Sequence, residues 1–295
     1  MRSTDYSEDI QSYQVSVSNE KIYSPSTQTG WGLRVWREMF IELINSRELI
    51  WRLFKRDFST RYRQSIMGFF WALILPLIAM GTFVFLNYSG LLKVGYTETP
   101  YPVFAIFGLT IWQAFSGGLT AGCNSLTLGG GIVTKINFPK ETLVLSAMGV
   151  TLVDFLVRLF LIAIILIIFQ VIPNWTAIFL PIVVLPLFTF TIGLGFILAL
   201  GNMVFRDTTN IVTVLTTFLM FLTPVVYPIH KTGIMAKIMA FNPLTSLITA
   251  PRDVVFTGYI TEPYGFLWTT IASVLLFLVG WRIFHSVEFK MAEVI

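Results

Sequence analysis

Charge, cysteine and histidine are scarce in this sequence. Charged residues make up 12% of its 295 positions, against about 25% in soluble proteins, while 55% are hydrophobic and the mean hydropathy is +0.75. Cys123 is the single cysteine, and His230 and His285 form no cluster with the spacing of a zinc site. These shortages exclude a soluble enzyme, a disulfide-rich secreted domain and a disordered tail. They indicate an integral membrane protein.

Motifs for nucleotide binding and for hydrolysis are also missing. The chain has no G-x-x-x-x-G-K-[ST] motif, and no lysine stands at the P-loop position after its Gly129-Gly130-Gly131 run. It has no H-E-x-x-H or G-x-S-x-G motif and no pair of carboxylates within an apolar run. We therefore expect no catalytic residue, no metal site and no cofactor in this chain, which makes it a conduit without its own energy source.

Six apolar stretches are long enough to cross a bilayer, which takes about 20 helical residues. They are continuously apolar, whereas the strands of a membrane barrel alternate polar and apolar residues. The stretches are residues 67–88, 101–123, 150–172, 176–202, 207–227 and 264–285. The sequence therefore predicts an all-α integral membrane protein, with six transmembrane helices in residues 67–295 and both termini on one side.

The distribution of lysine and arginine orients these six helices. Ten of the 20 basic residues precede the first span and five more lie in other segments on that side, whereas four lie on the opposite side. The positive-inside rule then places both termini in the cytoplasm. The basic balance thus encodes orientation, and we assign the chain no nucleic-acid partner. Residues 1–30 form a polar leader that lacks the apolar core of a cleavable signal peptide.

Residues 31–66 predict an amphipathic helix on the cytoplasmic surface. Apolar residues recur there at spacings of three and four, interleaved with basic residues. The helix fits an anchor to anionic membrane lipids as well as it fits a docking face for a partner, and periodicity does not separate the two. The charged side chains of this interface helix are Arg47, Arg52, Lys55, Arg56, Asp57 and Arg61.

The third span carries two charges about one turn inside the predicted cytoplasmic boundary. Asp154 and Arg158 stand at i and i+4, so they share a helix face and can neutralise each other. We favour a structural ion pair over an ion-conducting or proton-coupled site, because charges within membranes generally pair.

Two spans are rich in small or polar residues. The second contains Gln113, Ser116, Gly117, Gly118, Thr120, Gly122 and Asn124, and the fourth contains Pro181, Pro186, Gly193, Gly195 and Gly201. Small residues let helices pack closely, while polar ones can line a pore. In the second span we favour packing, and in the fourth both interpretations remain open.

About 36 residues separate the fifth span from the sixth on the predicted outer side, more than a plain connector needs. Two short apolar stretches lie there, at 233–241 and 244–250, separated by Asn242-Pro243. We predict a pair of re-entrant helices within about 229–256 that shape an outer mouth. The alternative is a cap on the surface.

Four blocks of sequence carry a family resemblance. The first runs from Arg47-Glu48-Leu49-Ile50-Trp51 through Arg61-Tyr62-Arg63-Gln64-Ser65-Ile66-Met67-Gly68 to Leu75-Pro76, and the second is 135–141. The third joins Phe205-Arg206-Asp207 to Leu222-Thr223-Pro224-Val225-Val226-Tyr227-Pro228, and the fourth is Asn242-Pro243-Leu244-Thr245 with Arg252. In this order the chain resembles the membrane subunits of type-2 ABC exporters for polysaccharides such as O-antigen, capsule and teichoic acid.

The resemblance implies partners and a location. Two copies of such a chain pair with two ATP-binding subunits, which hold the ATP and Mg, and export a lipid-linked polysaccharide across the bacterial inner membrane. Residues 34–63 match the family's interface helix, and 229–256 match its outer gate helices. The residues implied to couple the chain to the ATP-binding subunit are Lys135, Asn137, Phe138, Pro139, Lys140, Arg206 and Asp207.

Phe138 is the expected point of coupling. It is an apolar ring in a polar loop, stiffened by Pro139. ATP binding in the partner is expected to move this loop, and the first and fifth spans are expected to follow.

Aromatic side chains near the ends of the spans are candidates for lining a channel, because aromatic faces suit the apolar C–H faces of sugar rings. An interfacial belt of Trp and Tyr explains each single residue as well or better. The candidates are Phe69, Phe70, Trp71, Trp112, Phe115, Phe221 and Tyr227.

Two other functions compete with polysaccharide export. A permease for small lipids or drugs would share the fold and differ in the width and lining of its channel. A membrane transferase acting on lipid-linked sugars would need carboxylates or a histidine arranged for acid or base chemistry at the membrane surface, and the loops offer only scattered candidates.

Overall fold

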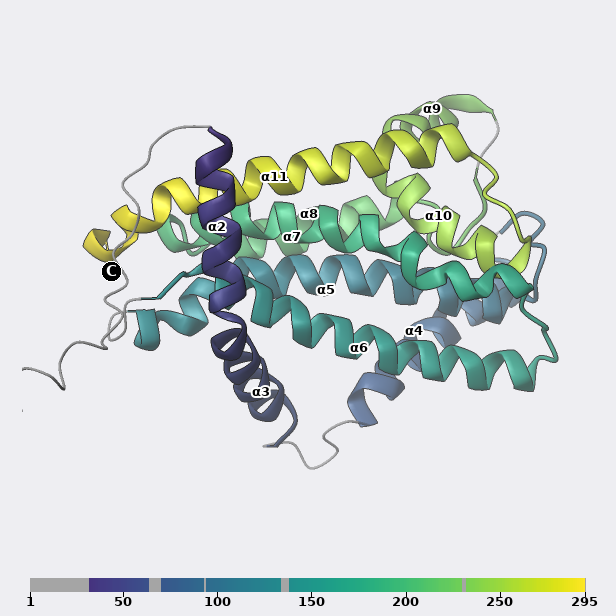
Figure 1. The fold of residues 1–295 in the computed structure, drawn as a ribbon. Helices are drawn as coiled ribbons and strands as arrows, with labels where there is room; N and C mark the ends of the chain where they lie inside the picture. The colour runs from purple at the N-terminus through teal and green to yellow at the C-terminus, as the bar shows by residue number, and fades with distance from the viewer. Residues whose placement is uncertain (1–31, 64–69, 93, 134–137, 230–231, 295) are drawn as a thin grey trace, which may run out of the picture.

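The computed structural model describes residues 32–63, 70–92, 94–133, 138–229 and 232–294, and within these ranges the regular structure is helical, without a strand (Figure 1). The helices are α2 (Leu33–Asn45), α3 (Arg47–Arg63), α4 (Phe70–Tyr88), α5 (Tyr101–Val133), α6 (Glu141–Ile168), the short 3₁₀ helix η2 (Trp175–Phe179), α7 (Leu180–Val204), α8 (Thr208–Phe221), α9 (Gly233–Phe241), α10 (Pro243–Phe256) and α11 (Pro263–Val294).

Five segments are long and apolar enough to cross a membrane: Phe70–Tyr88, Tyr101–Gly129, Glu141–Ile168, Trp175–Val204 and Pro263–Val287. They confirm a multi-pass helical membrane protein. The fifth predicted span, 207–227, forms α8, which ends after 14 residues. Pro224 explains this early end, because proline lacks an N–H and disfavours helical conformation in the residue before it. A crossing at the fifth predicted span, and with it the count of six, therefore stays a prediction.

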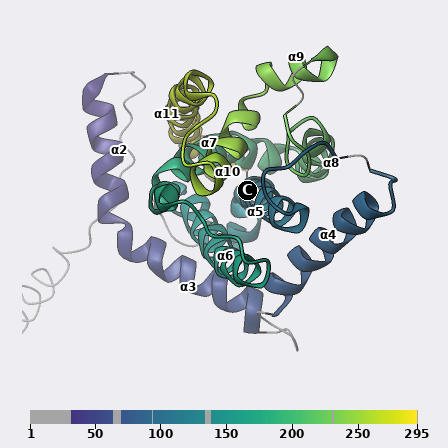
Figure 2. The same ribbon diagram turned by 90° about the vertical axis from the view of Figure 1, so that its right-hand side faces the viewer.

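Helix α5 lies at the centre of the bundle. Of its apolar segment, 78% is buried, against 6% for α4. Helices α4, α6, α7, α8 and α10 all contact α5, and Figure 2 shows it enclosed by them while α4 lies at the periphery. The predicted interface helix lies across one end of the bundle as α2 and α3 (Figure 1).

The interface helix is two helices and not one. It breaks at Ser46, whose backbone N–H donates to the carbonyls of Glu42 and Leu43 at 3.0 and 3.2 Å. Asn45 and Ser46 are weak helix formers whose side chains compete for backbone hydrogen bonds, which explains why the chain bends there. Helices α2 and α3 consequently point in different directions (Figure 2).

Glycines bring the central helices into close contact. A Cβ at Gly122 of α5 would lie 3.1 Å from the Cα of Gly195 on α7, and a Cβ at Gly193 would lie 2.8 Å from the Cα of Phe277 on α11. A Cβ at Gly280 of α11 would overlap the carbonyl oxygen of Gly193. These glycines of the second and fourth spans therefore serve packing.

The two predicted outer helices differ in burial. Ten of the 14 residues of α10 are buried, and α10 contacts α5, α7, α11 and η2. Helix α9 is mostly exposed, with Met239 as its buried residue. A surface cap describes α9, whereas α10 is part of the interior.

Asn202 of α7 joins three helices in a buried polar network. Asn202 is 2% exposed. Its Nδ2 donates to the Cys123 carbonyl at 3.1 Å and to Asn124 Oδ1 at 3.2 Å, both on α5. The hydroxyl of Thr209 on α8 lies 2.7 Å from Asn124 Oδ1 and 3.0 Å from Asn202 Oδ1. The network fixes the N-terminal end of α8 against α5 and α7.

Replacing Asn202 tests this network. We expect Asn202→Leu to lower the free energy of unfolding by about 1–3 kcal/mol, because Asn124 and Thr209 lose a buried partner. Thermal melting in detergent, followed by the loss of the monodisperse chromatographic peak, measures the change. Asn210→Leu, an exposed position on α8, is the matched control, and equal losses in the two variants would contradict the expected role of Asn202.

Candidate functional site

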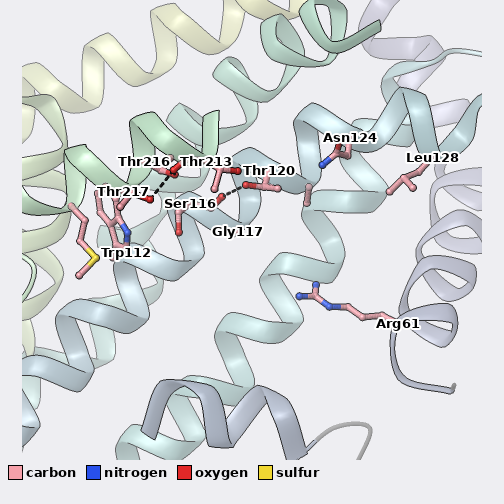
Figure 3. Close-up of a pocket in the computed structure, with 12 residues that line it drawn as sticks. Arg61, Trp112, Ser116, Gly117, Thr120, Asn124, Leu128, Thr213, Thr216 and Thr217 are labelled. Carbon is pink, nitrogen blue, oxygen red and sulfur yellow. Dashed lines mark hydrogen bonds between the residues drawn. The ribbon is translucent and has the colours of Figure 1, made fainter. Parts of the chain in front are cut away.

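A cavity of about 520 Å³ lies between α5 and α8, with Arg61 of α3 at one end (Figure 3). Most of its polar lining is made of hydroxyl and amide side chains, so we call it the hydroxyl groove. Its lining residues are Arg61, Trp112, Ser116, Gly117, Thr120, Ala121, Asn124, Leu128, Thr213, Thr216, Thr217 and Met220.

Helix α5 has two faces with different roles. Ser116, Thr120 and Asn124 follow one another at intervals of four, which places them on one side of the helix, and all three line the groove. Gly118 and Gly122 lie on another side, where a Cβ would meet the side chains of Thr191 and Met148 at 2.9 and 2.7 Å. The second span therefore packs closely on one face, the interpretation favoured from its sequence, and also lines the groove with another face.

Helix α8 supplies the opposite wall through three threonines. Thr213, Thr216 and Thr217 donate their hydroxyl protons to carbonyls of their own helix at 2.8 to 3.0 Å. Their oxygens keep lone pairs that can accept a hydrogen bond from a ligand. These threonines were not predicted from the sequence, although five threonines between 208 and 217 in an apolar stretch indicate a polar helix face.

Arg61 closes one end of the groove and ties α3 to α6. Its Nη1 lies 2.8 Å from Asp154 Oδ2; the Asp154 side chain is 5% exposed, whereas that of Arg61 is 52% exposed. The ion pair that the structure shows for Asp154 therefore comes from the interface helix. The proposed pairing of Asp154 with Arg158 stays a prediction.

A second cavity of about 510 Å³ adjoins the groove between α3, α5 and α6, and the two share Arg61, Ala121 and Leu128. Asp57 lies in its wall, where it pairs with Arg56 Nη2 at 2.7 Å and accepts a hydrogen bond from Ser146 Oγ of α6 at 3.2 Å. Because the three charged residues that line this cavity, Arg56, Asp57 and Arg61, are already paired, the second cavity adds little free charge to the site.

The other interface residues face outward. Arg47 is exposed, Arg52 pairs with Glu48 at 2.6 Å, and Lys55 Nζ lies 5.1 Å from the centre of the Trp51 ring. Such surface pairs contribute little stability. Because these side chains of α3 are exposed, they can contact lipid or a partner.

The predicted channel aromatics are scattered over the structure. Trp112 lines the groove, while the neighbouring Phe115 is 1% exposed and packs in the core. Phe70 and Trp71 are exposed on α4. Phe221 is exposed at the end of α8, where its carbonyl accepts a hydrogen bond from the Tyr227 hydroxyl. Phe69 lies outside the described residues.

Phe138 of the predicted coupling loop points into the protein. It is 5% exposed and belongs to a cluster that also contains Val35 and Met39 of α2 and Trp281 and Phe284 of α11. We call these five residues the Phe138 cluster. The ring thus contacts this chain itself and does not project from the loop.

The remaining predicted coupling residues divide into two groups. Pro139 and Lys140 are buried beside Phe138, whereas Arg206 and Asp207 are exposed in the turn between α7 and α8. Lys135 and Asn137 fall outside the described residues.

A buried contact next to the Phe138 cluster was not foreseen from the sequence. Glu141, the first residue of α6, lies with its Oε1 2.8 Å from Nδ1 of His285 on α11, and the two residues are 3% and 2% exposed. It links the start of α6 to the last helix. The hint in the sequence was that one of the two histidines of the chain, His285, lies near the end of the last predicted span. Among the described residues, no group of three or more His, Cys, Asp or Glu side chains could hold a metal ion.

Known proteins share these features of sequence. Residues 48–256 match the family model described as ABC-2 type transporter. The O-antigen export system permease protein RfbA of Myxococcus xanthus is 30% identical over 255 residues, covering 85% of this chain and 97% of that protein. A permease of the same name from Klebsiella pneumoniae is 27% identical over 244 residues, covering 81% and 92%. The polysialic acid transport protein KpsM of Escherichia coli is 21% identical over 254 residues, covering 81% and 93%. The chain belongs to the ABC-2 type transporter family of membrane proteins.

Proposed function

We propose that this chain is the transmembrane subunit of an ATP-driven exporter that moves a lipid-linked polysaccharide across the bacterial inner membrane. Family membership supports a transport function, and the names of the relatives support a polysaccharide as the substrate. The observation that carries the proposal in this chain is the hydroxyl groove, a polar surface within an otherwise apolar bundle.

The groove suits a polyol better than an apolar ligand. A sugar hydroxyl that leaves water needs a new hydrogen-bond partner, because an unpaired buried hydroxyl is costly. Serine, threonine and asparagine side chains can form hydrogen bonds with hydroxyls. Such side chains line the groove on both its α5 wall and its α8 wall. Trp112 adds an aromatic surface on which the C–H face of a sugar ring can pack.

In the proposed topology α8 begins the fifth crossing. Its 14 residues span about 21 Å at 1.5 Å per residue, short of the roughly 30 Å of the bilayer core, and residues 222–227 complete the distance. Both termini are then cytoplasmic, as the excess of lysine and arginine on their side requires. Helices α9 and α10 lie on the outer side, where α10 re-enters the bundle.

The proposed partners are two ATP-binding subunits and a second copy of this chain. ATP and Mg bind to the partner subunits, and this chain couples to them through the loop between α5 and α6 and through Arg206 and Asp207. The second copy would cover apolar surface of α4 and α8 that is exposed in the single chain, including Phe70, Leu75, Phe218 and Phe221. Two grooves facing each other would then enclose one path.

Co-purification and substrate stimulation test the function. The chain is expressed with candidate P-loop ATPase subunits from the same genome, the complex is reconstituted in lipid, and ATP hydrolysis is measured with and without lipid-linked polysaccharide. We expect a stable complex whose hydrolysis rises with the polymer. A chain that works without an ATPase, or a complex stimulated by small lipids or drugs and not by polymer, would overturn the proposal.

Phe138→Ala is expected to weaken coupling. The ring joins the loop to α2 and α11 through the Phe138 cluster, so its removal should lower polymer export and stimulated ATP hydrolysis per assembled complex. Phe196→Ala removes an equally buried ring from the same hydrophobic core, on α7, and controls for the cavity, which costs about 3–5 kcal/mol. If Phe138→Ala exports and hydrolyses as the unmodified complex does, the loop does not act through this ring.

The groove is tested by replacing hydroxyls with methyl groups. The double variant Thr213→Val, Thr217→Val should reduce export at least about tenfold if two sugar contacts of about 1 kcal/mol each are lost, while assembly and basal ATP hydrolysis persist. The matched control is Thr189→Val with Thr270→Val, whose hydroxyls also bond carbonyls of their own helices. A control that fails as strongly as the groove variant would remove the case for direct contact with the polymer.

A further inference from the structure

A short non-helical segment lies buried between α8 and α9. In residues 222–227, Thr223 and Val225 are 0% exposed and Val226 is 3% exposed. Backbone carbonyls of such a segment cannot pair within a helix, so they need donors from elsewhere in the protein. Three side chains, from α5, from α10 and from the residue that precedes α10, supply these donors.

Arg252 of α10 supplies two of the donors. Its Nη2 donates to the Val225 carbonyl at 2.7 Å and its Nη1 to the Pro224 carbonyl at 3.3 Å. The guanidinium carbon lies 3.8 Å from the centre of the Phe104 ring, which adds a cation–π contact. The residue is 6% exposed.

Gly108 of α5 makes room for this contact. A Cβ at position 108 would overlap both the Val225 carbonyl oxygen and the Nη2 of Arg252. The absence of a side chain at this position therefore creates a notch in α5 into which the carbonyl and the guanidinium fit together.

Two further side chains hold the same segment. The Tyr101 hydroxyl of α5 donates to the Val226 carbonyl at 3.1 Å. Asn242, the residue that precedes α10, donates through Nδ2 to Thr223 Oγ1 at 2.9 Å and to the Leu222 carbonyl at 3.3 Å. Side chains thus bind four backbone carbonyls of this segment, those of Leu222, Pro224, Val225 and Val226, and Arg252 binds the middle two.

The segment matters because α8 has little other support. Only Val212 and Thr216 of α8 are buried, while five of its large apolar side chains are more than half exposed: Ile211, Val214, Leu215, Phe218 and Phe221. The Asn202 network holds the N-terminal end of the helix. The 222–227 segment holds its C-terminal end, beyond the threonines that line the groove.

We propose that Arg252 is a positioning residue for transport, which holds the Val225 carbonyl in the Gly108 notch and thereby fixes the C-terminal end of α8 and the threonine wall of the hydroxyl groove. An apolar side chain could fill the same space without the cost of burying a charge. The guanidinium instead fixes the direction in which the Pro224 and Val225 carbonyls point, because its donors lie in one plane and at fixed angles. The importance of this for export rests on the proposed function.

The test follows the position of α8 directly. In a Cys123→Ala background, Thr217→Cys places one thiol on the groove wall, and its rate of modification by a water-soluble maleimide is measured in the assembled complex. We expect Arg252→Met and Gly108→Ala each to change this rate by about threefold or more, as displacement of a locally held element should. Thr249→Val, a buried hydroxyl one turn away on α10, is the control and should leave the rate unchanged.

A double variant separates positioning from general destabilisation. Arg252→Met and Gly108→Ala act on the same carbonyl, so their combination should change the rate no more than either alone, whereas independent effects would multiply. Unchanged rates in both single variants, or multiplied effects in the double variant, would overturn the proposal.

Folding and function remain distinguishable in this design. Arg252→Lys keeps the charge and one donor, and it should give a smaller change in the same direction; failure of all three variants to assemble would also overturn the proposal, since it would make Arg252 a folding determinant. Polymer export is measured on the same Arg252 and Gly108 variants without the Thr217→Cys and Cys123→Ala changes, because Thr217 lines the groove, and export should fall with the change in rate. A changed thiol rate in a complex that never exports polymer would contradict the proposed function and leave the positioning role of Arg252 intact.

Discussion

The close approach of α5 to α7 is the contact on which the other features depend. Neither Gly122 nor Gly195 carries a side chain that would separate the two backbones, and close van der Waals packing of this kind is one of the attractions available between helices inside a membrane. Because one side of α5 is committed to this packing, its other side is free to carry Ser116, Thr120 and Asn124. The central helix is therefore both the scaffold of the bundle and a wall of the groove.

Several buried polar groups in this apolar protein form contacts between two helices. Helix α3 meets α6 through Arg61 and Asp154, and α6 meets α11 through Glu141 and His285. Apolar packing alone allows helices to slide past one another with little change in energy, whereas a buried polar contact has a defined distance and angle. These few contacts add to the close glycine contacts in fixing the register of the helices.

The sequence predicted the helical class and most of the apolar elements, because a long apolar run signals a span without knowledge of its neighbours. It gave α8 too many residues, since the effect of Pro224 was outweighed by the apolar composition of the run. It also joined α2 to α3, because amphipathic periodicity continues across Ser46. Glycine packing was predictable in kind, while the residue facing each glycine was not.

Long-range partners were the least predictable part of the site. Asp154 has an arginine four positions away, so local spacing favours Arg158 as its partner, and only the folded chain brings Arg61 alongside. The inward turn of Phe138 was hidden for a similar reason, since the residues that bury it belong to α2 and α11, at opposite ends of the sequence. A local pattern shows which side chains need partners, and the tertiary fold decides which partners they find.

The bend at Ser46 divides the interface helix into two segments that contact different parts of the protein. The first segment, α2, packs in the Phe138 cluster through Val35 and Met39, and the second segment, α3, lines the groove with Arg61. If the loop between α5 and α6 receives the partner's movement, as proposed, then α2 and α3 offer that movement a route to the groove that does not pass through the core helices.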